Sequence, residues 1–138
     1  MTVSISVTFA NDQSEVEKLS HLVEAFGQVH GLHPQSVFSV NLALDEVVTN
    51  IIRYAYDDNR LPHPIVVRLA LEEGVLAMQV EDDGRAFNPL EAPAPDVNAT
   101  IEERPIGGLG IHLVRSIVDS VEYRRDDGRN VFIMKKRL

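Results

Sequence analysis

The sequence contains no cysteine. This absence excludes disulfide bonds, zinc sites built on thiolates and a cysteine nucleophile, and it fits a protein that works in a reducing compartment. No apolar run approaches the roughly 20 residues that a membrane-spanning helix needs, and the N-terminus is polar where a secretory signal is apolar. We therefore expect a cytoplasmic protein.

Basic residues are also scarce, with 13 Lys and Arg against 21 Asp and Glu, which leaves a formal net charge of −8. A chain this acidic is a poor ligand for a phosphate backbone, so we expect no direct binding to DNA or RNA, and none to membranes. The chain has 138 residues, of which 44% are hydrophobic. This size and composition predict a single domain over residues 1–138 with a core of its own.

Apolar residues spaced three and four apart predict three helices. The first follows Asp12, which is a candidate N-cap. The second covers about 34–56, with Pro34 in its first turn. The third contains the apolar residues between Leu109 and Val118.

Alternating apolar residues predict a strand over residues 4–9 and two later hairpins, with turns at Glu73-Gly74 and Asp127-Gly128. The order is strand, two helices, two strands, loop, helix, two strands. It predicts an α+β two-layer sandwich, in which helices cover one face of a mixed, mostly antiparallel sheet.

Glu46 and Asn50 lie four residues apart and so share one face of the second predicted helix, away from its apolar stripe. A carboxylate beside an amide oxygen can orient a nucleophile and hold Mg²⁺, which takes few protein oxygens and completes its shell with phosphate and water. Taken alone, such a pair is more often an ordinary solvated helix face.

Asp82 stands at the end of a predicted strand, two residues before Gly84. Strand alternation places it on the same face as Met78 and Val80, so its carboxylate points inward. An inward carboxylate needs hydrogen-bond donors, and the exocyclic amine of a purine is one. Taken alone, a polar turn after a strand is the commoner explanation.

Gly107, Gly108 and Gly110 open the third predicted helix. Glycine lets the backbone approach a ligand closely, and the free amides of a helix start favour phosphate, although a tight loop-to-helix junction would use the same residues. Residues 89–105 hold four of the seven prolines and few aliphatic residues, which predicts a loop. We expect a lid over the site at about 90–106.

Taken in chain order, these three motifs resemble those of the GHKL, or histidine kinase-like, ATPase family. The resemblance is carried by NLALDEVVTN at 41–50 with YAY at 54–56, DDGRAF at 82–87 and RPIGGLGIHLV at 104–114. It covers nearly the whole chain. Within the family, the short chain looks most like the anti-sigma-factor serine/threonine kinases of bacterial partner-switching systems.

The resemblance implies a layer of helices over a mixed sheet, with ATP and Mg²⁺ bound between them. By position it implies that Glu46 is the catalytic general base, that Asn50 is the Mg²⁺ ligand and that Asp82 accepts from the adenine amine. Gly84 would leave room for the base, and Phe87 would help to wall the pocket.

Other residues are implied to contact the nucleotide at its phosphate or adenine end. They are Arg53, Ala86, Gly108, Leu109, Gly110 and Ile111. Two departures from the family pattern concern the adenine end. Ala86 stands where the family often has a second glycine, and residues 121–138 contain no threonine, which the family often has near the adenine. We expect weaker adenine binding from these departures, with the phosphate end intact.

The function expected from the resemblance is that of an ATP-dependent serine/threonine kinase acting as an anti-sigma factor. It would phosphorylate a STAS-type anti-sigma antagonist, sequester a sigma factor and form a homodimer. Two other interpretations remain open: a nucleotide-binding partner-switch module without phosphotransfer, and a structural protein that binds no nucleotide.

Overall fold

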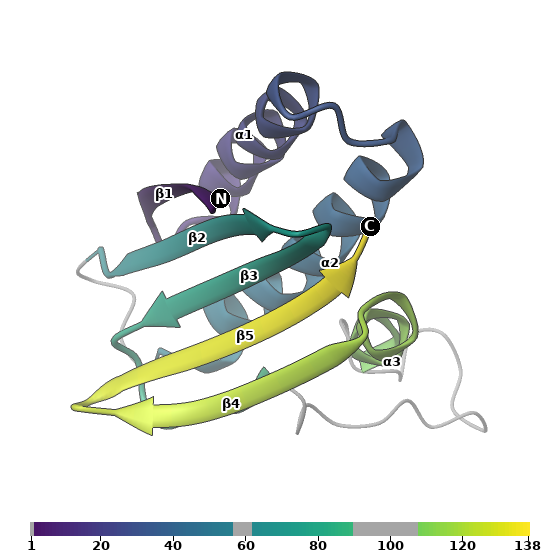
Figure 1. The fold of residues 1–138 in the computed structure, drawn as a ribbon. Coiled ribbons are helices and arrows are strands. Elements are labelled where there is room, and N and C mark those ends of the chain that lie inside the picture. Colours follow the sequence, from purple (N-terminus) through teal and green to yellow (C-terminus); the bar gives the residue numbers. More distant parts are fainter. Residues whose placement is uncertain (1, 57–61, 90–107) are drawn as a thin grey trace.

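The computed structural model describes residues 2–56, 62–89 and 108–138 (Figure 1). A short 3₁₀ turn, Gln13–Glu15, precedes the first α-helix. The elements are β1 (Val3–Ala10), α1 (Val16–Val29), α2 (Pro34–Tyr54), β2 (Pro64–Glu72), β3 (Val75–Asp82), α3 (Gly108–Ile117), β4 (Ser120–Asp126) and β5 (Arg129–Arg137). The predicted order of elements is confirmed, and α2 ends two residues before its expected end.

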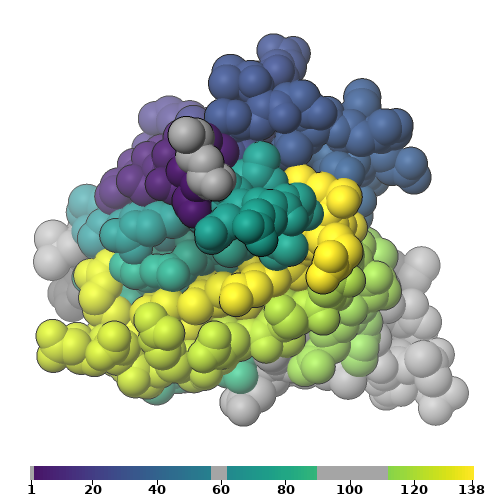
Figure 2. Space-filling model, viewed as in Figure 1, coloured from purple at the N-terminus to yellow at the C-terminus, as the bar shows by residue number. Residues whose placement is uncertain are grey.

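The strands form one sheet in the order β1-β2-β3-β5-β4, and every pairing among the described strands is antiparallel. Helices α1 and α2 lie behind this sheet in Figure 1, and α3 packs against α2. Figure 2 shows β2, β3, β5 and β4 side by side on the outer face, with no coloured helix across them. The α+β two-layer prediction is therefore confirmed.

Both predicted hairpin turns have positive φ at their two central residues. Glu73 and Gly74 have φ of 50° and 77°, and Asp127 and Gly128 have φ of 49° and 76°. This is the pattern of type I′ turns, whose twist matches that of the paired strands. The turns fix the register of β2 with β3 and of β4 with β5.

Side chains at the two helix starts satisfy free main-chain amides. Asp12 accepts a hydrogen bond from the Ser14 amide at 3.0 Å and starts the 3₁₀ turn, so α1 itself begins only at Val16. At α2, His33 Nδ1 accepts from the Gln35 amide at 3.1 Å. The His33 cap explains where α2 begins, and the Asp12 cap explains where the 3₁₀ turn begins. Glu15, at the start of α1 itself, makes no side-chain capping hydrogen bond to a described residue.

The core lies between the sheet and the apolar stripe of α2. Strands β2 and β3 contribute buried side chains at alternate positions, and α2 contributes them at helical spacing. Three buried residues in the described part of the chain are polar or charged: Asn50, Asp82 and Asn130. Because burying a polar group is costly unless it has partners, apolar packing alone does not account for these three residues.

Candidate nucleotide site

The three buried polar residues come from three different elements. Asn50 on α2 is 0% exposed, Asp82 at the end of β3 is 1% exposed, and Asn130 near the start of β5 is 2% exposed. Asn50 and Asp82 are site residues predicted from the sequence, and Asn130 is not. Asp82 and Asn130 are direct partners in the antiparallel register of β3 with β5.

The Asp82 carboxylate points inward, as strand alternation predicts. Its Oδ1 accepts hydrogen bonds from the Gly84 amide at 2.9 Å and from Asn130 Nδ2 at 2.8 Å. Its Oδ2 is buried and has no hydrogen-bond partner in the described part of the chain. Burial raises the pKa of Asp82, and the two hydrogen bonds oppose that rise. A donor from a ligand would satisfy the remaining oxygen, so the site fits an exocyclic amine.

Asn50 has a similar arrangement on α2. Its Nδ2 donates to the main-chain oxygen of Glu46 at 2.8 Å, which fixes the orientation of the amide. Its Oδ1 is buried and has no hydrogen-bond partner among the residues that the structure describes. A fixed, unpartnered amide oxygen is a suitable ligand for a hard cation, so the chemistry at Asn50 fits Mg²⁺.

Glu46 lies one helical turn before Asn50 and is half-buried. Burial raises the pKa of its carboxyl group, nearby Asp45 raises it further, and the positive charge of Arg53 opposes both. A raised carboxyl pKa brings the group closer to the range in which it works as a general base. Arg53 itself is exposed on the last turn of α2.

The turn after β3 is fixed to the C-terminal end of α2. The Arg85 amide donates to the Ala55 oxygen at 2.8 Å, and Arg85 Nε donates to the Tyr54 oxygen at 2.7 Å. A Cβ atom on Gly84 would lie only 2.4 Å from the Ala55 oxygen. Gly84 is therefore required for the close approach of two backbones, a reason that sequence reasoning missed. Its role in leaving room for a base stays a prediction.

Ala86 and Phe87, which follow Gly84 in the turn, differ in their burial. Phe87 is half-buried, and its ring centroid lies 5.8 Å from that of Tyr54. Ala86 is exposed. The structure thus places Phe87 against the end of α2, next to the turn that carries Gly84, where a wall of the predicted pocket is expected.

The glycine motif lies where the sequence predicts it, because α3 begins at Gly108 and includes Leu109, Gly110 and Ile111. The amides of a helix start are free to bind an anion. The side chains of Leu109 and Ile111 lie outside what the structure describes, as does the whole of the lid predicted at about 90–106.

Asn130 is the site residue that sequence reasoning missed. The signal in the sequence is an asparagine on the same strand face as Phe132 and Met134, since asparagine is depleted in strands. Its link to the site depends on the register that pairs it with Asp82, which the Asp127-Gly128 turn alone does not specify.

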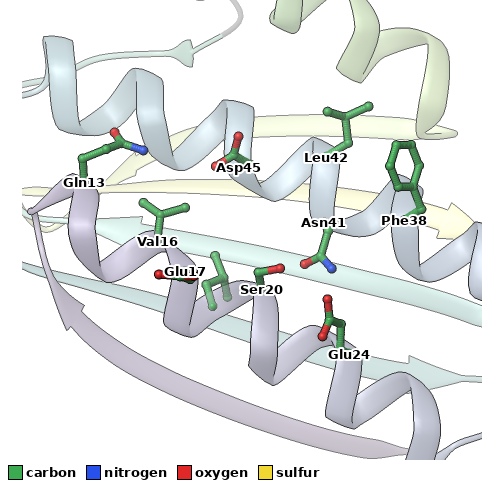
Figure 3. Close-up of a pocket in the computed structure, with 10 residues that line it drawn as sticks. Gln13, Val16, Glu17, Ser20, Glu24, Phe38, Asn41, Leu42 and Asp45 are labelled. Atoms are coloured by element: carbon green, nitrogen blue, oxygen red, sulfur yellow. The ribbon is translucent and has the colours of Figure 1, made fainter.

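A separate cavity of about 500 Å³ lies between α1 and α2 (Figure 3). Its lining includes the carboxylates of Glu17, Glu24 and Asp45, together with Leu42 and the exposed ring of Phe38. None of the described side chains predicted to bind nucleotide lines this cavity. This acidic cavity is thus distinct from the site built on Asn50 and Asp82.

Two kinds of feature do not occur among the described residues. No group of three or more His, Cys, Asp or Glu side chains there could hold a metal ion. Mg²⁺ takes few protein oxygens, so a site with Asn50 as a ligand would complete its shell with phosphate and water. None of the described helices is both long and apolar enough to cross a membrane.

Two relatives with similar sequences are both named as protein kinases. The serine/threonine-protein kinase BtrW of Bordetella bronchiseptica is 28% identical over 95 residues, which cover 67% of this chain and 65% of BtrW. The serine-protein kinase RsbW of Bacillus mycoides is 29% identical over 100 residues, which cover 70% of this chain and 61% of RsbW. The matches thus span less than two thirds of the length of these curated relatives.

Solved structures show the same fold. The crystal structure of the RsbU and RsbW domains of a Mycobacterium tuberculosis protein matches 99% of this chain and 32% of that chain, with a TM-score of 0.71 at 15% identity. The histidine kinase domain of a blue-light activated histidine kinase from Erythrobacter litoralis matches 91% of this chain and 60% of that chain, with a TM-score of 0.52 at 15% identity.

The family model of the histidine kinase-like ATPase domain matches residues 9–136, which is nearly the whole chain. The match includes all three sequence motifs and the three buried polar residues. The resemblance stated from the motifs is confirmed, and the chain belongs to the histidine kinase-like ATPase domain family.

Proposed function

We propose that this protein binds ATP with Mg²⁺ and transfers the γ-phosphoryl group to a serine or threonine hydroxyl of a partner protein. The observation that carries the proposal is the pair of buried, fixed oxygens, Asp82 Oδ2 and Asn50 Oδ1, which have no partner in the described chain. Each lies in a motif of a family of ATPase domains. One fits an amine donor and the other a cation.

The adenine would bind at the end of β3. Asp82 Oδ2 would accept from the exocyclic amine, and Phe87 and Ala86 would lie beside the base. The fixed turn at Gly84 keeps this acceptor in place before the ligand arrives, because its bonds to α2 involve main-chain atoms. A site organised in advance loses less entropy on binding.

The phosphates would bind at the start of α3 and near α2. The main-chain amides of Gly108, Leu109, Gly110 and Ile111 would donate to phosphate oxygens, and Arg53 would add a positive charge from α2. Asn50 Oδ1 would be the protein ligand of Mg²⁺. When bound, that ion neutralises charge on the phosphates and favours transfer.

Glu46 would act as the general base. Its half-buried carboxylate would accept the proton of the substrate hydroxyl as that oxygen bonds to the γ-phosphorus and ADP leaves. The burial that raises the pKa of Glu46 also makes the carboxylate a better proton acceptor. Asn50 and Glu46 thus have separate tasks, one in binding and one in proton transfer.

The partners proposed for this chain come from the relatives. BtrW and RsbW are named as serine/threonine- and serine-protein kinases. The sequence motifs resemble those of the kinases of bacterial partner switching. We infer that the chain is a cytoplasmic anti-sigma factor, that it sequesters a sigma factor, and that its phosphoryl acceptor is a STAS-type antagonist. A homodimer is part of the same proposal.

The test is transfer of radiolabelled phosphate from ATP to purified STAS-domain proteins encoded in the same genome. Wild-type protein should label one of them on serine or threonine, and Glu46→Gln should not. Glu122→Gln, which changes an exposed carboxylate on β4, is the matched control and should label it at the wild-type rate. Tight ATP binding without transfer to any candidate would replace the kinase with a nucleotide-binding switch module.

A further inference from the structure

Asn130 is the second residue of β5 and stands opposite Asp82 in the antiparallel register. Its side chain is 2% exposed, although a buried amide is costly unless its hydrogen bonds are made. Asparagine also has a low preference for strands. The hydrogen bonds of Asn130 therefore have to account for its presence in the core.

The amide nitrogen of Asn130 uses both of its hydrogens. Nδ2 donates to Asp82 Oδ1 at 2.8 Å and to the main-chain oxygen of Arg85 at 2.7 Å. A side-chain amide has two N–H donors, so no hydrogen of Asn130 is left for a ligand. The donor end of the residue is fully committed to the protein.

The amide oxygen of Asn130 is equally occupied. Oδ1 accepts from the Phe87 amide at 3.2 Å, from an Arg125 Nη1 at 3.0 Å and from the Tyr123 hydroxyl. A main-chain N–H and a guanidinium can only donate, so the amide cannot be turned over without opposing donor to donor. The orientation of Asn130 is therefore fixed by its surroundings.

These bonds restrict the carboxylate of Asp82. Its Oδ1 is held by Asn130 and by the Gly84 amide, and rotation of the carboxylate would break both hydrogen bonds. Oδ2 alone remains, buried and without a described partner. An ionised oxygen of this kind only accepts, so it favours an amine and opposes a carbonyl at the same place.

We propose that Asn130 is a positioning residue, which fixes Asp82 so that Oδ2 alone faces the base and thereby sets the preference for a purine with an exocyclic amine. This inference rests on the proposed ATP binding. Asn130 makes no hydrogen bond to the base, because its own donors and acceptor are used within the protein.

The experiment compares Asn130→Thr with Asn130→Val, two side chains of the same shape. The threonine hydroxyl can donate to Asp82, and valine cannot. Affinities for ATP and GTP are measured by calorimetry with Mg²⁺ for wild type and both variants. Tyr123→Phe is the control, since it removes one donor to Asn130 Oδ1 and leaves Asp82 held. If Asn130→Val fails to fold, as judged by circular dichroism, the pair Asn130→Ser and Asn130→Ala replaces it.

Wild type should prefer ATP to GTP, and Asn130→Val should reduce that preference about tenfold or more, as expected for one lost hydrogen bond to a charged group. Asn130→Thr and Tyr123→Phe should keep most of the preference. A merely structural role would weaken both nucleotides equally, so an unchanged ATP-to-GTP ratio in Asn130→Val overturns the inference. An equal loss of the preference for ATP over GTP in Asn130→Thr and Asn130→Val also overturns it. Wild type that binds no nucleotide overturns the proposed function itself.

Discussion

The main-chain amide of Arg85 donates a hydrogen bond to the main-chain oxygen of Ala55 over 2.8 Å. This bond joins the turn after β3 to the end of α2, and thus joins the motif with Asp82 to the motif with Asn50. Because it involves main-chain atoms, it does not depend on the identity of either side chain. It does depend on Gly84, whose missing Cβ allows the approach.

Gly84→Ala should therefore destabilise the protein and disturb the site. The added Cβ would lie 2.4 Å from the Ala55 oxygen, so one of the two backbones has to move. We expect the free energy of unfolding to fall by about 1–3 kcal/mol, as for other overpacked positions, and ATP binding to weaken. Urea unfolding and calorimetry measure the two effects.

Gly128→Ala is the comparison for that variant. Gly128 has φ of 76° and open space around it, so alanine there introduces backbone strain of about 1–2 kcal/mol without a clash. It should lower stability and leave ATP affinity at the wild-type value. Gly84→Ala with wild-type stability and wild-type ATP affinity would show that the approach to Ala55 is not constrained.

Asp82→Asn should separate stability from binding. Burial raises the pKa of Asp82, so its contribution to stability is present below the ordinary aspartate pKa and is lost as the pH rises through the raised value. At neutral pH the charged form costs stability. Without nucleotide, Asp82→Asn should gain stability relative to wild type as the pH rises from acid to neutral, while its ATP affinity falls about tenfold or more.

Denaturation with urea at a series of pH values, without nucleotide, measures this difference for wild type and Asp82→Asn. Asp126→Asn, an exposed substitution on β4, is the control and should show no such pH-dependent gain. A difference between wild type and Asp82→Asn that does not vary with pH would contradict the assigned cost of the buried charge.

Asn50→Ala and Glu46→Gln should fail in different ways. Asn50→Ala removes the oxygen assigned to Mg²⁺, so it should weaken ATP binding in Mg²⁺ and have little effect on binding in chelator. Glu46→Gln should bind ATP as wild type does and lose transfer by about 10²–10⁴-fold, the usual contribution of a general base. Calorimetry with Mg²⁺ or chelator, and phosphate incorporated into the partner, are measured for both. Equal loss of ATP affinity in the two variants would remove the distinction between their roles.

The rate of transfer should rise with pH on its acid side, because Glu46 accepts a proton only when it is ionised. Arg53 lowers the pKa of Glu46, and burial raises it. Arg53→Gln should therefore move the acid limb of the pH–rate profile to higher pH. Arg115→Gln, on the last turn of α3, is the matched control. An acid limb at the same pH in Arg53→Gln and wild type would show that another group controls the rate.

Much of the fold follows from local sequence signals. Both hairpin turns, Glu73-Gly74 and Asp127-Gly128, have glycine at the second central position, and the structure has positive φ at all four positions. The inward direction of Asp82 follows from strand alternation. These predictions succeed because each depends on a few neighbouring residues.

The network around Asn130 could not be predicted in the same way. Its partners Asp82, Arg85 and Phe87 lie at or just after the end of β3, and its partners Tyr123 and Arg125 lie on β4. They meet only because β5 pairs with β3 on one side and with β4 on the other. The steric need for Gly84 was missed for the same reason, since Ala55 approaches it through the packing of α2 on the sheet.

The register that pairs Asp82 with Asn130 makes the length of the nearby chain as important as its residues. A shift of one residue in a strand turns every side chain to the opposite face. One residue inserted between the Asp127-Gly128 turn and Asn130, with the strand pairing kept as far as the turn, would therefore move the amide to the open side of the sheet and leave Arg129 or the inserted residue facing Asp82. Relatives that keep an amine-selective site should vary in the sequence of this turn and strand start, but not in the number of residues.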